Sequence, residues 1–205
     1  MRLASLLAAC ALGLPLQAAE FSLPPPPRAV ADCVTCHGVA GRGNPAVGAP
    51  PLAGLPAWYT AHQLRAFRDG WRGTADDDVP GWEMQAVAVS LDAAELRQAT
   101  DWFAAMEKPL SGPETIEGDT ARGEMLYAAC AECHGGSGEG RRELGAPPLA
   151  GRPGWYLLRQ LTNYRAGRRG FHPDDERGQR MAASARQLPD DGAVRDVVTY
   201  IEQLK

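Results

Sequence analysis

The chain has 205 residues, of which 21 are Lys or Arg and 25 are Asp or Glu, so its formal net charge at pH 7 is −4. This acidic balance argues against nucleic acid and anionic lipid as partners, because both repel negative charge. The length suits one or two small domains, and a hydrophobic content of 44% is enough for compact cores.

Residues 1–19 have the pattern of an export signal. Arg2 supplies the positive charge, Leu3 to Leu16 is an apolar run, and Gln17-Ala18-Ala19 supplies small residues for cleavage. The run is shorter than the roughly 20 apolar residues that a membrane span needs. We therefore expect a periplasmic protein without a transmembrane helix after processing. A lipid anchor at Cys10 is not expected, because too little apolar sequence precedes it.

The rest of the chain is a tandem duplication. An offset of 97 residues, the separation of Cys33 and Cys130, aligns most of it without a gap. The aligned segments include residues 48–54 with 145–151, Trp58-Tyr59 with Trp155-Tyr156, Gln63-Leu64 with Gln160-Leu161, Arg72 with Arg169, and Met84 with Met181. We expect a first domain over residues 20–106, a linker over 107–118 that holds Pro109 and Pro113, and a second domain over 119–205.

The first copy should begin with a shortened helix. Residues 24–27 are four consecutive prolines, which cannot form a helix interior and favour an extended polyproline segment. Further along, Asp92 and Glu95 form a capping box for a helix that runs through Met106. The apolar side chains of that last helix need a cover, for which we expect the polyproline segment or a partner subunit: Leu96, Trp102, Phe103 and Met106.

The second copy should contain four helices. They are expected from Asp119 to Cys130, from Gly154 to Ala166, around Met181, and from about Asp190 to Leu204. The expected inward residues are Trp155, Leu158, Leu161 and Tyr164 in the second of these, and Val194, Val197, Val198 and Ile201 in the last. Neither copy has a strand or hairpin pattern. The predicted fold class is therefore all-α, with two tandem helical domains.

Each copy carries the pattern C-x-x-C-H, as Cys33-Val34-Thr35-Cys36-His37 and as Cys130-Ala131-Glu132-Cys133-His134. This is the attachment motif for c-type haem. Two cysteines three positions apart lie on one side of a helical turn, where they can form thioethers to the two vinyl groups at one porphyrin edge. The histidine that follows can then bind the iron. The sequence therefore predicts two covalently bound haem c groups.

Other sites also use C-x-x-C, namely a redox dithiol, a disulfide or half of a zinc centre. A single zinc centre built from both pairs would leave the two following histidines and the duplication unexplained. The haem interpretation accounts for all three features together.

The sixth iron ligands are predicted to be Met84 and Met181. Each lies 47 residues after the histidine of its own motif. The rival ligands His62 and His172 are not repeated at the offset of 97. A thioether is a soft ligand that stabilises ferrous iron. With His and Met on each iron no position stays open, which favours electron transfer over catalysis.

Further residues are candidates to surround the haems. Pro50 and Pro147 can offer a carbonyl oxygen to the Nδ1–H of the iron-bound histidine. Six others are candidates to wall the haems or to bind their propionates: Trp58, Tyr59, Arg72, Trp155, Tyr156 and Arg169. Ordinary core packing is the alternative for the aromatic members of this set.

These features resemble the dihaem cytochromes c of the c-four group. The resemblance covers most of residues 28–205 and rests on two C-x-x-C-H-G copies, each followed by P-x-L-x-G, a W-Y…Q-L helix and a distal Met. It implies two class I cytochrome c folds with neighbouring haems, and a proline carbonyl that accepts from the proximal histidine. Residues 155–181 are also similar to cytochrome c domains that accompany haem-copper oxidases.

The resemblance implies periplasmic transfer of single electrons between a respiratory donor and an acceptor such as a terminal oxidase. The expected partners are redox proteins: a terminal oxidase, a cytochrome bc-type complex or a periplasmic dehydrogenase. The alternative is a dihaem electron-accepting subunit of such a dehydrogenase, for example a flavoprotein or thiosulfate-oxidising complex. A dihaem peroxidase is a third hypothesis, which requires one iron to lose its methionine.

Overall fold

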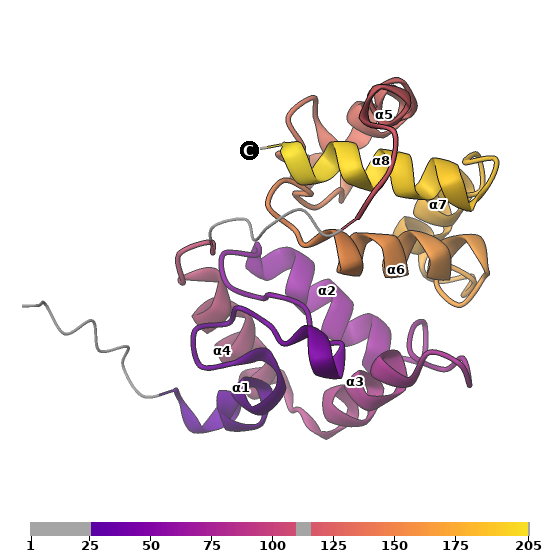
Figure 1. Ribbon diagram of the computed structural model, residues 1–205. Coiled ribbons are helices and arrows are strands. Elements are labelled where there is room, and N and C mark those ends of the chain that lie inside the picture. The colour runs from indigo at the N-terminus through magenta and orange to yellow at the C-terminus, as the bar shows by residue number, and fades with distance from the viewer. Residues whose placement is uncertain (1–25, 110–115, 205) are drawn as a thin grey trace, which may run out of the picture.

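The computed structural model describes residues 26–109 and 116–204. The expected export signal, Cys10 and part of the expected linker lie outside these ranges. Within them the regular elements are helices, accompanied by three isolated β-bridges (Figure 1). The helices are α1 Ala31–His37, α2 Ala57–Arg68, α3 Val79–Ser90, α4 Ala93–Ala104, α5 Thr120–His134, α6 Gly154–Arg165, α7 Glu176–Ala185 and α8 Asp191–Gln203, with 3₁₀ turns at Arg28–Val30, Pro45–Val47 and Arg142–Leu144. None of the described helices is long and apolar enough to cross a membrane.

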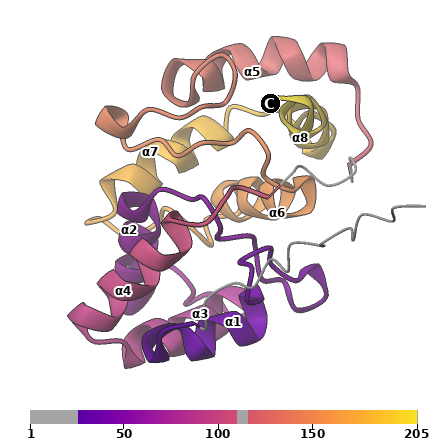
Figure 2. The same ribbon diagram turned by 90° about the vertical axis from the view of Figure 1, so that its left-hand side faces the viewer.

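The helices form two groups that follow the duplication. The first repeat contains α1 to α4 and the second contains α5 to α8 (Figure 1). Helix α2 of the first repeat and α6 of the second face each other across the boundary, whereas α5 lies on the far side of the second repeat (Figure 2). The all-α prediction with two tandem helical units is confirmed.

Helix starts follow the local sequence signals. The Asp92 side chain accepts hydrogen bonds from the backbone N–H groups of Ala94 and Glu95, while the Glu95 carboxylate accepts from the N–H of Asp92. This is the predicted capping box. Asp119 and Asp190 cap α5 and α8 in the same way, each accepting from one N–H in the first turn. A side-chain cap of this kind stabilises a helix by about 1 kcal/mol.

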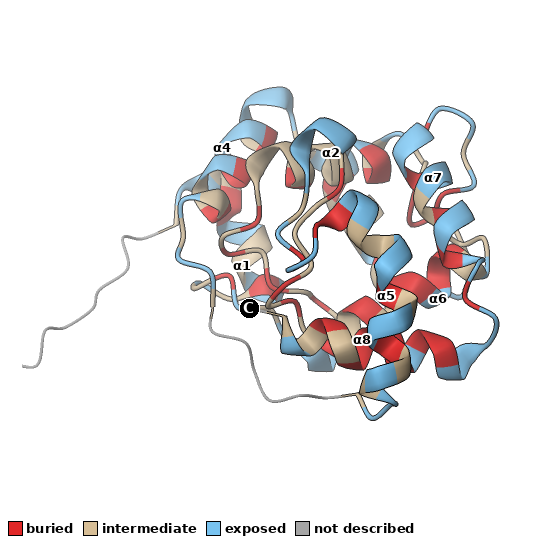
Figure 3. Cartoon of the chain, turned by 90° about the horizontal axis from the view of Figure 1, so that it is seen from above, coloured by how far each residue is buried: buried red, intermediate tan, exposed pale blue. Residues whose placement is uncertain are grey.

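The core of the second repeat is built on the crossing of α5 and α8. Gly123 permits close approach there, because a Cβ at this position would overlap the backbone carbonyl oxygen of Asp196. The predicted inward residues of α8 are all buried: Val194, Val197, Val198 and Ile201. The outer sides of α4, α5 and α7 are exposed (Figure 3).

The predicted inward face of α6 needs a correction. Leu161 and Tyr164 are buried as expected, but Leu157 takes the place in the core, and Trp155 and Leu158 are only half-buried. The reason is that α6 has two covered sides. One packs on α8, and the other faces the first repeat and also buries Gln160.

The first repeat has the predicted short initial helix. Helix α1 has 7 residues against 15 in its counterpart α5. The cover of α4 comes from the 3₁₀ turn that precedes α1, because Val30 is fully buried against Ala99 and Phe103. Trp102 and Met106 pack against the same cluster and stay partly exposed. Val30 thus covers part of this face. Whether the polyproline segment covers more of it stays a prediction, because residues 24 and 25 lie outside the described ranges.

Candidate metal centres

Both C-x-x-C-H motifs lie at the carboxyl ends of helices, α1 and α5. All four cysteines are free thiols, and in each pair the first is half-buried and the second exposed. His37 and His134 are the last residues of their helices, and each is followed by a glycine with a φ near +80° that turns the chain away. The turn is required because the chain must leave the helix without covering the imidazole, and glycine adopts positive φ without strain.

The two imidazoles are held in the same orientation. The Nδ1 of His37 lies 2.7 Å from the carbonyl oxygen of Pro50, and the Nδ1 of His134 lies 2.8 Å from that of Pro147. With Nδ1–H donating to the carbonyl, the lone pair of Nε2 is left for a metal. These are the two contacts expected from the sequence.

Burial lowers the pKa of His37 and of His134, although the hydrogen bonds to Pro50 and Pro147 oppose the shift. Both rings are nearly inaccessible to solvent. The result is a neutral imidazole at neutral pH, which is the form that binds iron.

The imidazoles and the predicted methionines line one continuous cavity of about 680 Å³. The imidazoles and thiols enter it from α1 and α5, and the thioethers of Met84 and Met181 enter it from α3 and α7. Within residues 26–109 and 116–204, no group of three or more His, Cys, Asp or Glu side chains is arranged to hold a metal ion.

The rival histidines are engaged elsewhere. The Nε2 of His62 lies 3.6 Å from a carboxylate oxygen of Asp175, at the edge of the cavity. His172 does not line the cavity. Its ring stacks on Trp71 with centroids 5.8 Å apart, and its Nδ1 accepts from the N–H of Asp174.

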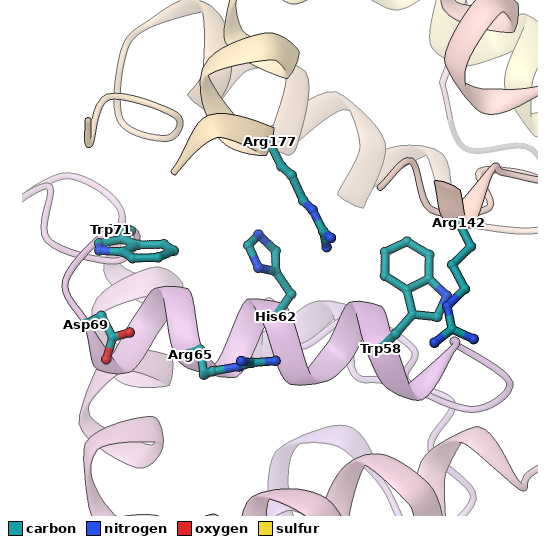
Figure 4. Close-up of a pocket in the computed structure, with 7 residues that line it drawn as sticks. All are labelled: Trp58, His62, Arg65, Asp69, Trp71, Arg142 and Arg177. Atoms are coloured by element: carbon teal, nitrogen blue, oxygen red, sulfur yellow. The ribbon is translucent and has the colours of Figure 1, made fainter. Parts of the chain in front are cut away.

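Of the six residues predicted to surround the haems, four line the cavity and two do not. Tyr59, Tyr156, Arg72 and Arg169 line the cavity. Trp58 and Trp155 do not, and each instead packs edge-on against the tyrosine that follows it, with ring centroids 5.8 Å apart. Trp58 lines a separate pocket at the boundary between the repeats (Figure 4).

Arg72 and Arg169 join the two repeats through a reciprocal network. The Oε1 of Gln63 accepts from Arg72 at 2.8 Å and from Arg169 at 2.7 Å, and the Oε1 of Gln160 accepts from the same two arginines at 2.9 and 2.8 Å. The backbones of Arg72 and Arg169 also form an antiparallel bridge. Both arginines are buried, so this network fixes the relative position of the repeats.

Three arginines around the cavity each keep one buried N–H without a hydrogen-bond partner among the described residues. The donors are the Nε atoms of Arg72, Arg152 and Arg159. All three side chains line the cavity, and burial lowers the pKa of Arg152 and of Arg159. A buried donor without a partner costs about 1–3 kcal/mol, so these groups suit an anionic ligand. Haem propionates have the matching charge, and the residues present therefore fit the predicted cofactor.

The sequence did not single out Arg152 or Arg159. Arg152 directly follows the second P-x-L-x-G segment, and its side chain donates to the carbonyl oxygen of Pro51 in the first repeat. Arg159 donates to the carbonyl oxygen of Gly48 at 2.6 Å, again in the first repeat. Contacts between repeats have no local sequence signal, which is why both residues were missed.

Known proteins share these features. The family model for cytochrome c matches residues 28–106 and 120–205. The chain is 36% identical to a thiosulfate dehydrogenase electron acceptor of Thiomonas intermedia, with 82% of this chain and 78% of the relative covered. It is 31% identical to cytochrome c4 of Pseudomonas aeruginosa, with 74% of this chain and 75% of the relative covered.

Two solved structures agree with the sequence relatives. Reduced recombinant cytochrome c4 from Pseudomonas stutzeri matches with a TM-score of 0.68 at 27% identity, covering 86% of this chain and 95% of that one. A thiosulfate dehydrogenase from Marichromatium purpuratum also matches with a TM-score of 0.68, at 29% identity. That match covers 84% of this chain but only 36% of the larger protein. The chain belongs to the cytochrome c family and is a dihaem c-type electron carrier rather than an enzyme, with two haem c groups and the ligand pairs His37–Met84 and His134–Met181.

Proposed function

We propose that the protein is a periplasmic carrier that accepts single electrons from a thiosulfate dehydrogenase and delivers them to an acceptor such as a terminal oxidase. The observation that carries the proposal is the shared cavity, which both ligand pairs line. Two centres in one continuous space give an electron a short path from one repeat to the other. Entry at one repeat and exit at the other then need no motion of the protein.

The ligand donors support transfer without catalysis. With the haems bound, His37 with Met84 and His134 with Met181 would give each iron an imidazole nitrogen and a thioether sulfur, which would leave no position open for a substrate. Haem supplies the one-electron chemistry, and the chain supplies axial ligands, burial and charge, which set the reduction potential. The peroxidase hypothesis would need one of the two methionines to leave, and nothing in the ligand set favours that.

The cavity-lining cations have a proposed role in holding the cofactors. Arg72, Arg152 and Arg159 each keep an unpaired Nε in the buried boundary between the repeats. We assign them, together with Arg169, Tyr59 and Tyr156, to the haem propionates. Arg72 and Arg169 already outweigh the effect of burial on the pKa of Tyr156 and hold it below its usual range, which shows how positive this region is.

The choice of donor rests on the relatives. A protein named a thiosulfate dehydrogenase electron acceptor and one named cytochrome c4 are both similar to this chain, the first at somewhat higher identity. The larger Marichromatium thiosulfate dehydrogenase contains a region that matches most of the chain. The export pattern of residues 1–19 supports the periplasm as the location, and the matched ranges support domain limits near 20–106 and 119–205.

The test is a rapid-mixing experiment with the oxidised dihaem protein. Thiosulfate and a purified thiosulfate dehydrogenase should reduce both haems within turnover times of the enzyme, and omission of thiosulfate should leave them ferric. Absence of reduction with an enzyme that reduces its own acceptor would contradict the proposed donor.

The second candidate is a general respiratory carrier of the cytochrome c4 kind, which the 95% coverage of the cytochrome c4 structure favours. In that case a cytochrome bc-type complex with its quinol should reduce the protein, and thiosulfate dehydrogenase should not. Running the two donors side by side separates the candidates.

A further inference from the structure

The contact between His62 and Asp175 joins the first repeat to the methionine helix of the second. His62 points from α2 toward the second repeat (Figure 4), and its Nε2 lies 3.6 Å from Oδ1 of Asp175. Asp175 is the residue before α7, which carries Met181, and the same oxygen accepts from the N–H of Gly178 at 2.9 Å. The carboxylate is almost fully buried, and the imidazole is 19% exposed. A charge on His62 therefore acts directly on the start of the helix that holds a haem ligand.

The duplication places an equivalent pair, Arg159 and Asp78, at the positions that correspond to His62 and Asp175 in the other repeat. The position 97 residues after His62 is Arg159 on α6, and the position 97 residues before Asp175 is Asp78, the residue before α3. The Asp78 carboxylate acts to raise the pKa of Arg159 against the effect of burial. Each repeat thus presents one basic side chain to the methionine helix of the other. In one direction the side chain is arginine, which stays charged, and in the other it is histidine, a side chain that can bind or release a proton.

The charges around His62 leave Asp175 as its main partner. Asp69, the residue after α2, lines the same pocket as His62 and is paired with Arg68 at 3.5 Å. Other charged or titratable groups lie around the imidazole and Asp175. The first repeat contributes Arg65 from α2 and Arg72 from the loop after it, and the second repeat contributes Arg142, Tyr164, Arg169, His172, Asp174 and Arg177. Burial raises the pKa of Asp175, but His62, the N–H of Gly178 and Arg169 together hold it below its usual range. The carboxylate is therefore charged at neutral pH and ready to pair with an imidazolium.

We propose that His62 takes up a proton when the haem of the second repeat is reduced. His62 lines the cavity that both ligand pairs line, and its contact with Asp175 lies at the start of the helix that carries Met181, so an electron added to the second-repeat haem favours a positive charge on the imidazole. One electron arrives from the donor protein and converts ferric to ferrous iron, and one proton arrives from solvent and binds to the imidazole; no other bond forms or breaks. By linkage, the same coupling makes reduction easier when His62 is protonated.

The proposed coupling acts on the second-repeat haem, because the contact of His62 is with the residue that begins the helix carrying Met181. The potential of the second-repeat haem should fall as the pH rises through the range in which His62 loses its proton. The limiting slope is about 59 mV per pH unit, the one-electron equivalent of a tenfold change. The first-repeat haem should show no such dependence near neutral pH, because Arg159 keeps its charge there. The inference holds whichever donor the protein uses.

The test is a redox titration of the holoprotein at a series of pH values from about 5 to about 9, with each haem followed separately by its haem-methyl NMR signals. H62R keeps a positive charge and should abolish the slope while leaving the second-repeat potential near its low-pH value. H62N should abolish the slope and leave that potential near its high-pH value. R159H should create a new slope in the first-repeat haem.

Two results would overturn the proposal. One is a second-repeat potential that is flat with pH in the unchanged protein. The other is a slope that persists in both His62 variants, since another group would then carry the proton. Far-UV circular dichroism checks that each variant is folded, and R159H tests the idea in the other repeat should a His62 variant fail to fold.

Discussion

Replacement of Gly123 by Ala should destabilise the second repeat through a single added methyl group. The new Cβ would overlap the backbone carbonyl oxygen of Asp196, lie 2.7 Å from its carbonyl carbon and lie 3.0 Å from the Cβ of Tyr200. Favourable carbon contacts occur at about 3.5–4.0 Å. Two of the three neighbours are backbone atoms, so no change of rotamer relieves the clash, and α5 and α8 must move apart.

The magnitude follows from two opposing effects. Alanine is a better helix former than glycine by about 1 kcal/mol. Overpacking of a well-packed core costs about 1–3 kcal/mol, and the upper end applies here because backbone atoms are struck. The net loss is about 2 kcal/mol. For a domain of this size, each kcal/mol lowers the melting temperature by about 4–8 °C, so a fall of about 8–16 °C is expected.

Differential scanning calorimetry of the holoprotein measures this fall. Gly136→Ala is the matched control, since Gly136 is exposed and nothing lies within 4 Å of an added Cβ. Its melting temperature should stay within about 2 °C of the unchanged protein, in line with other exposed substitutions. An unchanged or raised melting temperature for Gly123→Ala would refute the account of the α5–α8 crossing.

Two further predictions concern the Asp175 cap of helix α7 and the packing of Val30 on helix α4. Asp175→Ala should cost about 1 kcal/mol at neutral pH through the lost cap of α7. Because the pKa of Asp175 is lowered in the folded state, the stability contributed by its ionised form is present above the unfolded pKa and is lost as the pH falls through the folded one. The free energy of unfolding measured with urea should therefore differ less between Asp175→Asn and the unchanged protein as the pH falls. A difference that grew in acid would contradict the assignment. Val30→Ala should cost about 2 kcal/mol in the first repeat through loss of two buried methyl groups and the cavity left behind, and no change in its urea midpoint would show that another segment covers α4.

The sequence predicted the parts of the fold that have local signals. The capping box of Asp92 and Glu95, the proline-shortened first helix and the two C-x-x-C-H motifs each lie within a few neighbouring residues. The hydrogen bond between His37 and Pro50 was also predicted, because a proline stiffens the loop while keeping its carbonyl oxygen free to accept, and because the P-x-L-x-G segment resembles that of the family.

The contacts between the repeats could not be predicted in this way, because no local sequence signal marks them. Gln63 and Gln160 stand at equivalent positions, but the alignment of the copies does not tell that each accepts from arginines of both repeats. The buried side of α6 was misplaced for the same reason, since a helix covered on two sides loses the simple apolar period. Val30 was missed because one buried side chain in a three-residue turn produces no periodic pattern.

The most direct test of the two closed haem centres is the near-infrared sulfur-to-iron charge-transfer band of the ferric holoprotein, measured per chain in the unchanged protein, in Met84→Ala and in Met181→Ala. The intensity of the band in the unchanged protein should correspond to two His/Met-ligated haems per chain. Each variant should keep about half of that intensity, and the haem that lost its thioether should have a lower reduction potential. A band that survives intact in Met181→Ala, with His172→Ala changing the spectrum instead, would contradict the ligand assignment and with it the closed electron-transfer centre.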